Sequence, residues 1–271
     1  AYEIGVRLVV SEMCIRDRIY SMTIEDYFTA TNLIHNISEE EYERVKSLSK
    51  VFDAISRTTY QSLYIIDYYK KNFLYVSDNP LFLCGHTSEE VRDMGYLFYI
   101  QHVPEKEQSM LMELNKAGFN FFDKLDLEER LSYSISYDFH IISGRKATLI
   151  NHKLTPVILT DDGKIWLAAC FVSLSAHESP GHIEIRKQGQ TEFWEYSLEG
   201  HRWNINEGLE LSDREKDILS LSARGYTMNE ISDKLCIAID TVKFYKRRLF
   251  ERLNVKNITE ALSFATNYKL L

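Results

Sequence analysis

The stretch Thr241-Val242-Lys243-Phe244-Tyr245-Lys246-Arg247-Arg248-Leu249-Phe250-Glu251-Arg252-Leu253 has the pattern of an amphipathic helix with one cationic side. At 3.6 residues per turn one face is apolar, and it carries Val242, Tyr245, Leu249 and Leu253. The opposite face carries Asp240, Lys243, Phe244 and Arg247. Five of the ten residues 243–252 are Lys or Arg and only Glu251 is acidic, a composition that suits an anionic polymer. A solvated face of an ordinary helix would give the same pattern, so the flanking sequence is needed to distinguish the two interpretations.

Two helix-start signals precede this stretch. Ser212 and Glu215 have the spacing of a capping box, and Thr227 and Glu230 repeat it. Gly225 is placed to end the first of these helices. Two helices joined by a turn of three or four residues, the second of them amphipathic and basic, predict a helix-turn-helix. A fourth helix from Thr259 would close the bundle.

The spacing of the motifs in this region is itself informative. The relevant residues are Leu211-Ser212-x-Arg214-Glu215, Ile218-Leu219, Gly225, Glu230-Ile231, Leu235, Thr241-Val242-Lys243, Arg248-Leu249, Leu253-x-Val255 and Thr259-Glu260-Ala261. In order and spacing they resemble the LuxR (NarL/FixJ) type of helix-turn-helix domain. The resemblance implies a four-helix DNA-binding domain, usually dimeric on DNA, with its third helix in the major groove.

The resemblance also assigns roles to side chains. It places Lys243, Phe244 and Arg247 at base-facing positions, where Lys or Arg can donate to guanine and Phe can meet a thymine methyl group. The residues better placed to contact phosphates are Thr241, Lys246, Arg248 and Lys256. Such contacts position the helix without reading sequence.

The sequence departs from the family at three positions. Ala238 stands where the family often has Ser, so the third helix is expected to lack an N-cap worth about 1 kcal/mol. Asp240 in the first turn would compensate in part through the helix dipole. Tyr245 replaces the commoner His, and Ile258 replaces an Arg.

Length and charge favour two domains. The chain has 271 residues, 45% of them hydrophobic, and a formal net charge of −8. Residues 211–271 carry eleven basic and eight acidic residues, a net charge of +3, whereas the remainder carries 21 and 32, a net charge of −11. A mildly basic module joined to an acidic partner domain is compatible with DNA binding under separate control.

Two whole-chain features restrict the environment of the protein. No run of about 18 apolar residues occurs, so no membrane partner is expected and a cytoplasmic location is predicted. The four cysteines lack the paired spacing of a zinc site or a redox dithiol; they are Cys14, Cys84, Cys170 and Cys236. We therefore expect buried free thiols and no metal site.

The N-terminal region begins with a stretch unlike the rest. Val10–Arg18, within residues 1–21, is similar to a translated sequencing-adapter read-through, so residues 1–21 are interpreted as a non-native extension. Thr23 and Asp26 predict a short helix through Leu33. Ser38 and Glu41 start a better one, whose apolar positions are Val45, Leu48, Phe52 and Ile55. This second helix either lies on its own domain or forms a dimer contact.

From Ser62 the pattern becomes that of strands. Leu63–Asp67 and Phe73–Val76 predict a hairpin, followed by a short helix ending at Gly85 and another starting after Thr87. A longer helix is expected from Pro104 to Gly118. Three further strands are predicted, at Ser134–Ile142, Ala147–Leu159 and Ile165–Ser173.

This order of elements, together with Asp67, Tyr75-Val76, Asn79, Leu83, Gly85, Thr87, Glu89-Glu90-Val91 and His102-Val103-Pro104-Glu105, resembles a PAS domain over residues 50–175. The resemblance implies a sensor or dimerisation module that sometimes holds a flavin, a haem or a small metabolite. Pro80 occupies the position of the cysteine in flavin photoreceptors, and His102 precedes the longer helix on which a haem ligand commonly lies. No cofactor is therefore predicted. A pocket for a small-molecule ligand is retained as an alternative.

The sequence thus predicts an α+β fold in which a PAS-like antiparallel sheet with flanking helices precedes an all-α four-helix domain. The expected divisions are an extension (1–21), N-terminal helices (22–56), a PAS-like domain (57–175), a strand-containing connector (176–208) and the helix-turn-helix domain (209–271). No nucleophile elbow, phosphate loop or zinc-type spacing indicates an enzyme. The predicted function is a sequence-specific transcription regulator that binds double-stranded DNA as a homodimer, with the PAS-like domain sensing a signal or mediating dimerisation. The alternative is a PAS-based scaffold whose terminal bundle binds protein.

Overall fold

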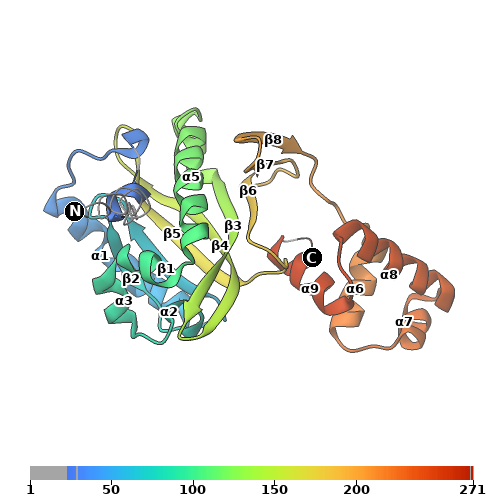
Figure 1. The fold of residues 1–271 in the computed structure, drawn as a ribbon. Coiled ribbons are helices and arrows are strands. Elements are labelled where there is room, and N and C mark those ends of the chain that lie inside the picture. The colour runs from blue at the N-terminus through green and yellow to red at the C-terminus, as the bar shows by residue number, and fades with distance from the viewer. Residues whose placement is uncertain (1–22, 29, 269, 271) are drawn as a thin grey trace, which may run out of the picture.

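The computed structural model describes residues 23–28, 30–268 and 270. A mixed α/β part with an eight-stranded antiparallel sheet leads into a helical C-terminal bundle (Figure 1). The sheet order is β2-β1-β5-β4-β3-β6-β7-β8. The strands are β1 (Ser62–Asp67), β2 (Asn72–Val76), β3 (Tyr133–Ser143), β4 (Lys146–Leu159), β5 (Ile165–Leu174), β6 (Gly181–Lys187), β7 (Phe193–Ser197) and β8 (Arg202–Asn206).

One face of the sheet is covered by helices that follow β2. They are α2 (Pro80–Leu83), α3 (Ser88–Met94), α4 (Leu97–His102) and α5 (Glu105–Phe122), with a 3₁₀ segment η3 (Leu127–Ser132) after them. Phe82, Phe98 and Leu114 of these helices are buried with Tyr64, Phe139 and Ile150 of the sheet in one core. Because Phe119 and Phe122 join that core, α5 extends beyond Gly118, where the sequence predicted its end. The predicted strands and hairpin are confirmed.

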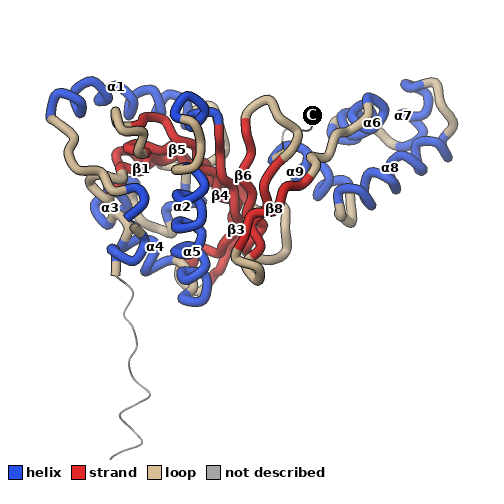
Figure 2. The backbone as a smooth tube through the Cα atoms, turned by 90° about the horizontal axis from the view of Figure 1, so that it is seen from above, coloured by secondary structure: helices blue, strands red, loops and turns tan. Residues whose placement is uncertain are grey.

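The opposite face of β1 and β5 is covered by α1 (Glu39–Ser56), seen along the upper edge of Figure 2. Its predicted capping box is present, since Ser38 N–H donates to Glu41 and Glu41 N–H donates to Ser38 Oγ. Val45 and Phe52 are buried in a second core with Trp166 and neighbouring strand residues. The helix therefore packs on its own sheet, whereas Ile55 is 41% exposed.

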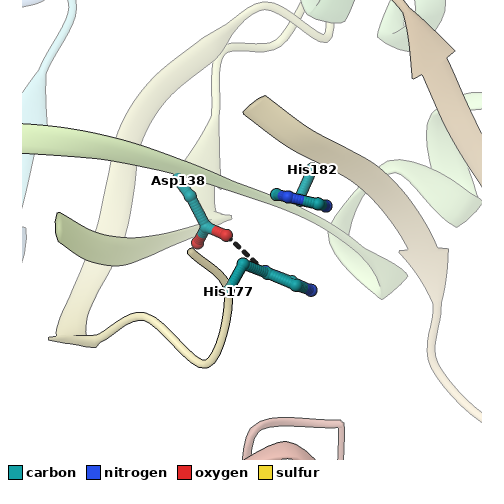
Figure 3. A group of neighbouring side chains, drawn as sticks. All are labelled: Asp138, His177 and His182. Carbon is teal, nitrogen blue, oxygen red and sulfur yellow. Dashed lines mark hydrogen bonds and ion pairs between the residues drawn. The ribbon is translucent and has the colours of Figure 1, made fainter. Parts of the chain in front are cut away.

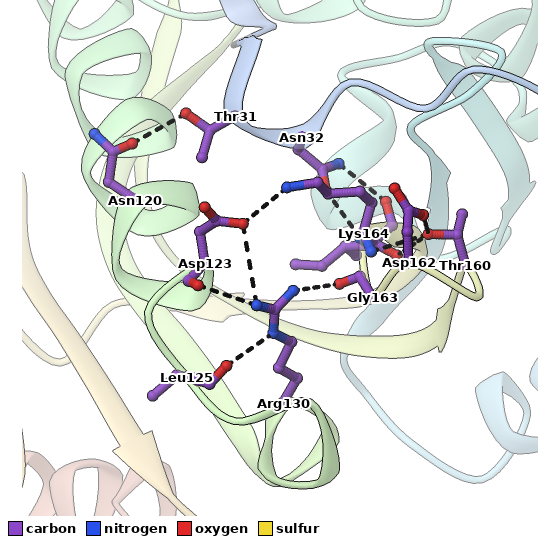
Figure 4. Close-up of polar contacts among 11 residues, drawn as sticks. Thr31, Asn32, Asn120, Asp123, Leu125, Arg130, Thr160, Asp162, Gly163 and Lys164 are labelled. Carbon is purple, nitrogen blue, oxygen red and sulfur yellow. Dashed lines mark hydrogen bonds and ion pairs between the residues drawn. The ribbon is translucent and has the colours of Figure 1, made fainter.

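The predicted helix from Thr23 through Leu33 is wrong. Two 3₁₀ segments, η1 (Ile24–Tyr27) and η2 (Ala30–Asn32), replace it, and the Thr23–Asp26 capping box starts only the first. Burial of Tyr27 and the contacts of Asn32 favour this broken path. Asn32 Nδ2 donates to the carbonyl of Ile165, and Ile165 N–H donates to Asn32 Oδ1 (Figure 4). The expectation for residues 1–21 lies outside the described residues.

A buried arginine joins the end of α5 to the turn between β4 and β5 (Figure 4). Arg130 donates to the carbonyls of Leu125, Gly163 and Asp123 at 3.2, 2.6 and 3.1 Å. Three carbonyl acceptors satisfy a guanidinium that is only 8% exposed. This network fixes the turn between β4 and β5, beside which Asn32 of the N-terminal segment lies.

Strands β6, β7 and β8 extend the sheet at β3, so residues 176–208 contain strands, as the sequence predicted. Trp194 and Trp203 pack against Phe121 of α5, with ring centroids 5.2 and 5.5 Å away. These strands therefore share the core of the sheet.

The C-terminal bundle consists of α6 (Asp213–Ala223), α7 (Met228–Leu235), α8 (Ile239–Leu253) and α9 (Ile258–Asn267). Its position at one end of the molecule is clear in Figure 1. In the described residues, Cys84 and Cys170 are buried as expected, but Cys236 is exposed because it occupies the turn after α7. The expectation of a buried thiol is thus wrong for Cys236, and Cys14 lies outside the described residues. None of the described helices has both the length and the apolar character needed to cross a membrane.

Candidate nucleic-acid interface

The turn between α7 and α8 is held by local contacts. The capping box at Thr227 and Glu230 starts α7, as the sequence predicts. Cys236 ends it with φ +52°, in the left-handed region. Ser232 Oγ donates to the carbonyl of Ile237 at 2.5 Å and closes the turn. Because these contacts involve neighbouring residues, the angle between α7 and α8 is specified locally.

The rotation of α8 about its own axis is set by the core. Val242 is fully buried with Ile218 of α6 and Ile231 of α7, and Tyr245 packs against this cluster. Further along, Leu249 and Leu253 are buried against Leu219 and α9. The apolar face predicted for α8 is therefore its inner face, and the remaining residues must face outward.

The predicted base-facing residues lie together on the outer face of α8. Lys243, Phe244 and Arg247 are all exposed, and Phe244 keeps 48% of its surface in solvent. Lys243 Nζ lies 3.0 Å from Asp240 Oδ1, and Arg247 Nε lies 3.9 Å from Glu251 Oε1. All four of these charged side chains are exposed, so the pairs hold the cations only weakly and an anion can compete for them.

The four predicted phosphate contacts differ in their surroundings. Thr241 and Lys246 are half-buried, and Arg248 is exposed with no ion pair to another described residue. Burial lowers the pKa of Lys246, and a phosphate beside it would favour the charged form. Lys256 lies apart, just before α9, and its Nζ is 2.5 Å from Glu178 in the loop between β5 and β6. Three of the four residues are thus grouped on α8, and the fourth is occupied by a carboxylate.

Arg252 is one of the five basic residues in 243–252, but its side chain turns inward. Its guanidinium donates to both carboxylate oxygens of Glu215 at 2.6 Å and to the carbonyl of Glu210. Burial alone would raise the pKa of Glu215, but hydrogen bonds from Arg252 and from Ser212 outweigh it and hold the pKa below its usual value. Sequence reasoning missed this structural role, because nothing in the pattern of α8 indicates a carboxylate on α6.

The expected absence of an N-cap on α8 is seen at Ala238. This residue has the extended backbone of an N-cap, with φ −66° and ψ 148°, but no side-chain oxygen to accept from the first turn. Asp240 is 91% exposed and bonds to Lys243. The first turn of α8 therefore has no side-chain cap, although the Thr241 N–H donates to the carbonyl of Ala238 at 2.9 Å.

Comparisons with known proteins agree with this geometry. Residues 209–265 match the family model described as "Bacterial regulatory proteins, luxR family". The oxygen regulatory protein NreC of Staphylococcus epidermidis is 27% identical over 165 residues, which cover 60% of this chain and 72% of that protein. The CsgBAC operon transcriptional regulatory protein of Escherichia coli is 40% identical over 67 residues, or 25% of this chain and 31% of that protein.

Coverage of the relatives varies. Three NreC proteins are matched over 72%, 28% and 59% of their length. Among solved structures, the phage VqmA–DPO complex has a TM-score of 0.30 at 16% identity, covering 87% of this chain and 93% of that one. A Vibrio VqmA–ligand–DNA complex has a TM-score of 0.28 at 16% identity, covering 86% and 89%.

The match to the family model covers α6 to α8 and most of α9, so it includes the whole outer face of α8. The named sequence relatives are regulatory proteins rather than enzymes. At its C-terminus this chain therefore carries a LuxR-type helix-turn-helix domain.

Proposed function

We propose that this chain is a sequence-specific, DNA-binding transcription regulator whose N-terminal part controls the helix-turn-helix domain. The observation that carries the proposal is the exposed group Lys243, Phe244 and Arg247 on a helix whose other face is buried. A helix held in this way can enter the major groove without losing its packing. Arg247 and Lys243 would donate to guanine, and Phe244 would meet a thymine methyl group.

The phosphate contacts would orient that helix. Thr241, Lys246 and Arg248 lie on α8 itself, so they can reach the two backbones that flank the groove. Lys256 would join them after leaving Glu178. These contacts carry no sequence information, and they would make the affinity strongly dependent on salt.

We assign the sensing or dimerising part to residues 57–175 as a PAS-like domain. The support is the order of elements, a hairpin, short helices, a longer helix and three antiparallel strands, with the helices on one face. Residues 22–56 would be its N-terminal helices, and residues 176–208 would form the connector to the terminal domain (209–271).

A cavity between α5 and the sheet bears on what this domain could sense. It has a volume of about 30 Å³ and is lined mainly by Tyr68, Leu114, Phe119, Tyr137 and Leu154. Ligand pockets for drug-sized molecules are typically about ten times larger, so a metabolite would enter only if α5 moved away from the sheet. A homodimer formed through this domain is the alternative way in which it would act on DNA binding.

The test begins with a pool of random DNA duplexes from which the full chain selects its target. Binding to the selected duplex is then measured for Arg247→Ala. Loss of one good base contact should weaken binding roughly 5- to 150-fold, which corresponds to about 1–3 kcal/mol. Light scattering of the same complexes gives their stoichiometry, and two chains per duplex are expected.

Arg44→Ala is the matched control. Arg44 is an exposed helical arginine with a carboxylate one turn away, Glu40, as Arg247 has Glu251, but it lies on α1. Its replacement should leave DNA binding unchanged. If Arg247→Ala and Arg44→Ala both bind as the wild type does, the bundle has another partner, and the protein-binding scaffold becomes the better hypothesis.

A further inference from the structure

Three side chains converge where β3 is paired with β6, beside α9. Asp138 lies on β3, His182 lies on the neighbouring strand β6, and His177 lies in the loop that leads into β6 (Figure 3). Each offers one oxygen or nitrogen atom, and these atoms all lie within 4.8 Å of one another. No residue of this group takes part in the proposed DNA interface.

We propose that Asp138, His177 and His182 form a binding site for a divalent transition-metal ion. Two imidazole nitrogens and one carboxylate oxygen are a ligand set found for Zn²⁺ and for Fe²⁺. Ca²⁺ and Mg²⁺ prefer oxygen ligands alone, so they are excluded by the two imidazoles. With three protein ligands, water would complete the coordination.

The carboxylate is held in position before any metal arrives. Asp138 is fully buried, and its Oδ1 accepts a hydrogen bond from Asn151 Nδ2 at 2.7 Å. Its Oδ2 lies 2.5 Å from His177 Nδ1. An amide that holds a ligating carboxylate is a common outer-shell arrangement in metal sites. A metal would take the place of the proton shared between Nδ1 and Oδ2, and that proton would leave to solvent.

The second imidazole is stacked on the first. The rings of His177 and His182 lie 3.7 Å apart with an angle of 9° between their planes. His182 has φ +49°, in the left-handed region, which is costly for a residue with a side chain. Parallel rings cannot both point at one ion, so metal binding would turn the exposed His182 ring.

The surroundings favour a cation and allow it to enter. Glu184 lies two residues after His182 on the same face of β6, and it is paired in register with Glu195 of β7. Arg186 is paired with Glu184. His182 is exposed, so a hydrated ion reaches the group from solvent.

A different pair, His86 with Glu90 at 3.8 Å, also has a second imidazole beside it, since the Nε2 atoms of His86 and His102 lie 3.1 Å apart. Two further histidine–carboxylate pairs in the described residues lack a second imidazole. His140 Nδ1 lies 2.8 Å from Glu107, and His201 Nδ1 lies 2.6 Å from Glu113. His201 is exposed and has φ +48°, so it matches His182 in exposure and in backbone conformation. It therefore provides the control for a single histidine beside a carboxylate.

The test is titration of the full chain with Zn²⁺ in competition with a chromophoric chelator. The wild type should bind one ion at this group, and His182→Asn should weaken that binding by about 100-fold or more, whereas His201→Asn should not change it. His182 is exposed, so its replacement leaves the core intact, and circular dichroism verifies the fold. Asp138→Asn should act in the same direction.

The exposed thiol of Cys236 is the competing ligand that must be separated. Zinc binding should persist in Cys236→Ser, and the Co²⁺ form should lack the thiolate-to-cobalt charge-transfer band in the near ultraviolet. Equal affinity of the wild type and His182→Asn would overturn the proposal. Loss of the ion in Cys236→Ser would overturn it as well.

Discussion

Lys256 and Glu178 form an ion pair at 2.5 Å that joins the start of α9 to the loop between β5 and β6. The partners are 78 positions apart, and they link the part that contains the sheet to the helical bundle. Glu178 raises the pKa of Lys256, and Lys256 lowers the pKa of Glu178. The pair occupies one of the cations proposed to bind phosphate, so it opposes DNA binding in this arrangement.

Replacing the Glu178 carboxylate should therefore strengthen DNA binding. Glu178→Gln is expected to tighten binding about twofold in dilute salt, because the pair is solvent-exposed and weak. The difference should vanish at high salt, where exposed charges are screened. Affinities are measured by fluorescence anisotropy on the selected duplex. Glu199→Gln removes an exposed carboxylate that has no ion pair to another described residue, and it should change nothing.

Salt titration tests the phosphate contacts on α8. The logarithm of the binding constant should fall linearly with the logarithm of salt concentration. Lys246→Met or Arg248→Met should each reduce that slope by about one unit, because one fewer phosphate is neutralised. Arg247→Ala should instead change which sequences are preferred. A complex insensitive to salt would contradict the proposed interface.

Local sequence signals were sufficient where the structure depends on neighbours in the chain. The capping boxes at Ser212, Thr227 and Ser38 were predicted because the side chain and its backbone partner are three residues apart. The burial of Val242 and Leu249 follows from helical periodicity. The cationic face of α8 could therefore be predicted before the fold was known.

Contacts between distant residues could not be predicted in this way. Arg252 was counted with the cations of α8, but its partner Glu215 is 37 positions earlier. Asp138 and His177 are 39 positions apart, and only the pairing of β3 with β6 brings His182 beside them. Cys236 is exposed in a turn with a left-handed backbone. Gly or Asn is the usual residue in that conformation, so a cysteine did not indicate the turn.

The Arg252–Glu215 pair should stabilise the terminal domain. Glu215 is 1% exposed, so Arg252→Met would leave a buried carboxylate without its cation. We expect the free energy of unfolding to fall by about 1–3 kcal/mol, measured by urea denaturation of the full chain. Arg214→Met is the control, since Arg214 is exposed and lies 4.0 Å from Asp217. Equal losses in the two variants would contradict the structural role of Arg252.

The same pair makes stability depend on pH in a defined direction. The pKa of Glu215 is lowered in the folded protein from a reference value of 4.5. Its contribution is therefore fully present above about pH 4.5, and it is lost as the pH falls through the lower folded value. Comparing wild type with Glu215→Gln from pH 7 to pH 3 should show a difference that shrinks as the solution becomes acidic. A difference that grows in acid would mean that burial, rather than Arg252, dominates this carboxyl group.

Restoring the missing N-cap should stabilise α8. Ala238 already has the backbone conformation of an N-cap, so a serine hydroxyl there can accept from the N–H groups of the first turn without strain. Ala238→Ser is expected to add about 1 kcal/mol to the stability of the terminal domain. In a domain of this size that corresponds to a rise of about 4–8 °C in its Tm by calorimetry. Ala238→Val keeps the extended backbone but offers no acceptor, so it should give no gain. If serine and valine behave alike, the first turn of α8 is already satisfied by other groups, and the absence of a cap at Ala238 costs the domain nothing.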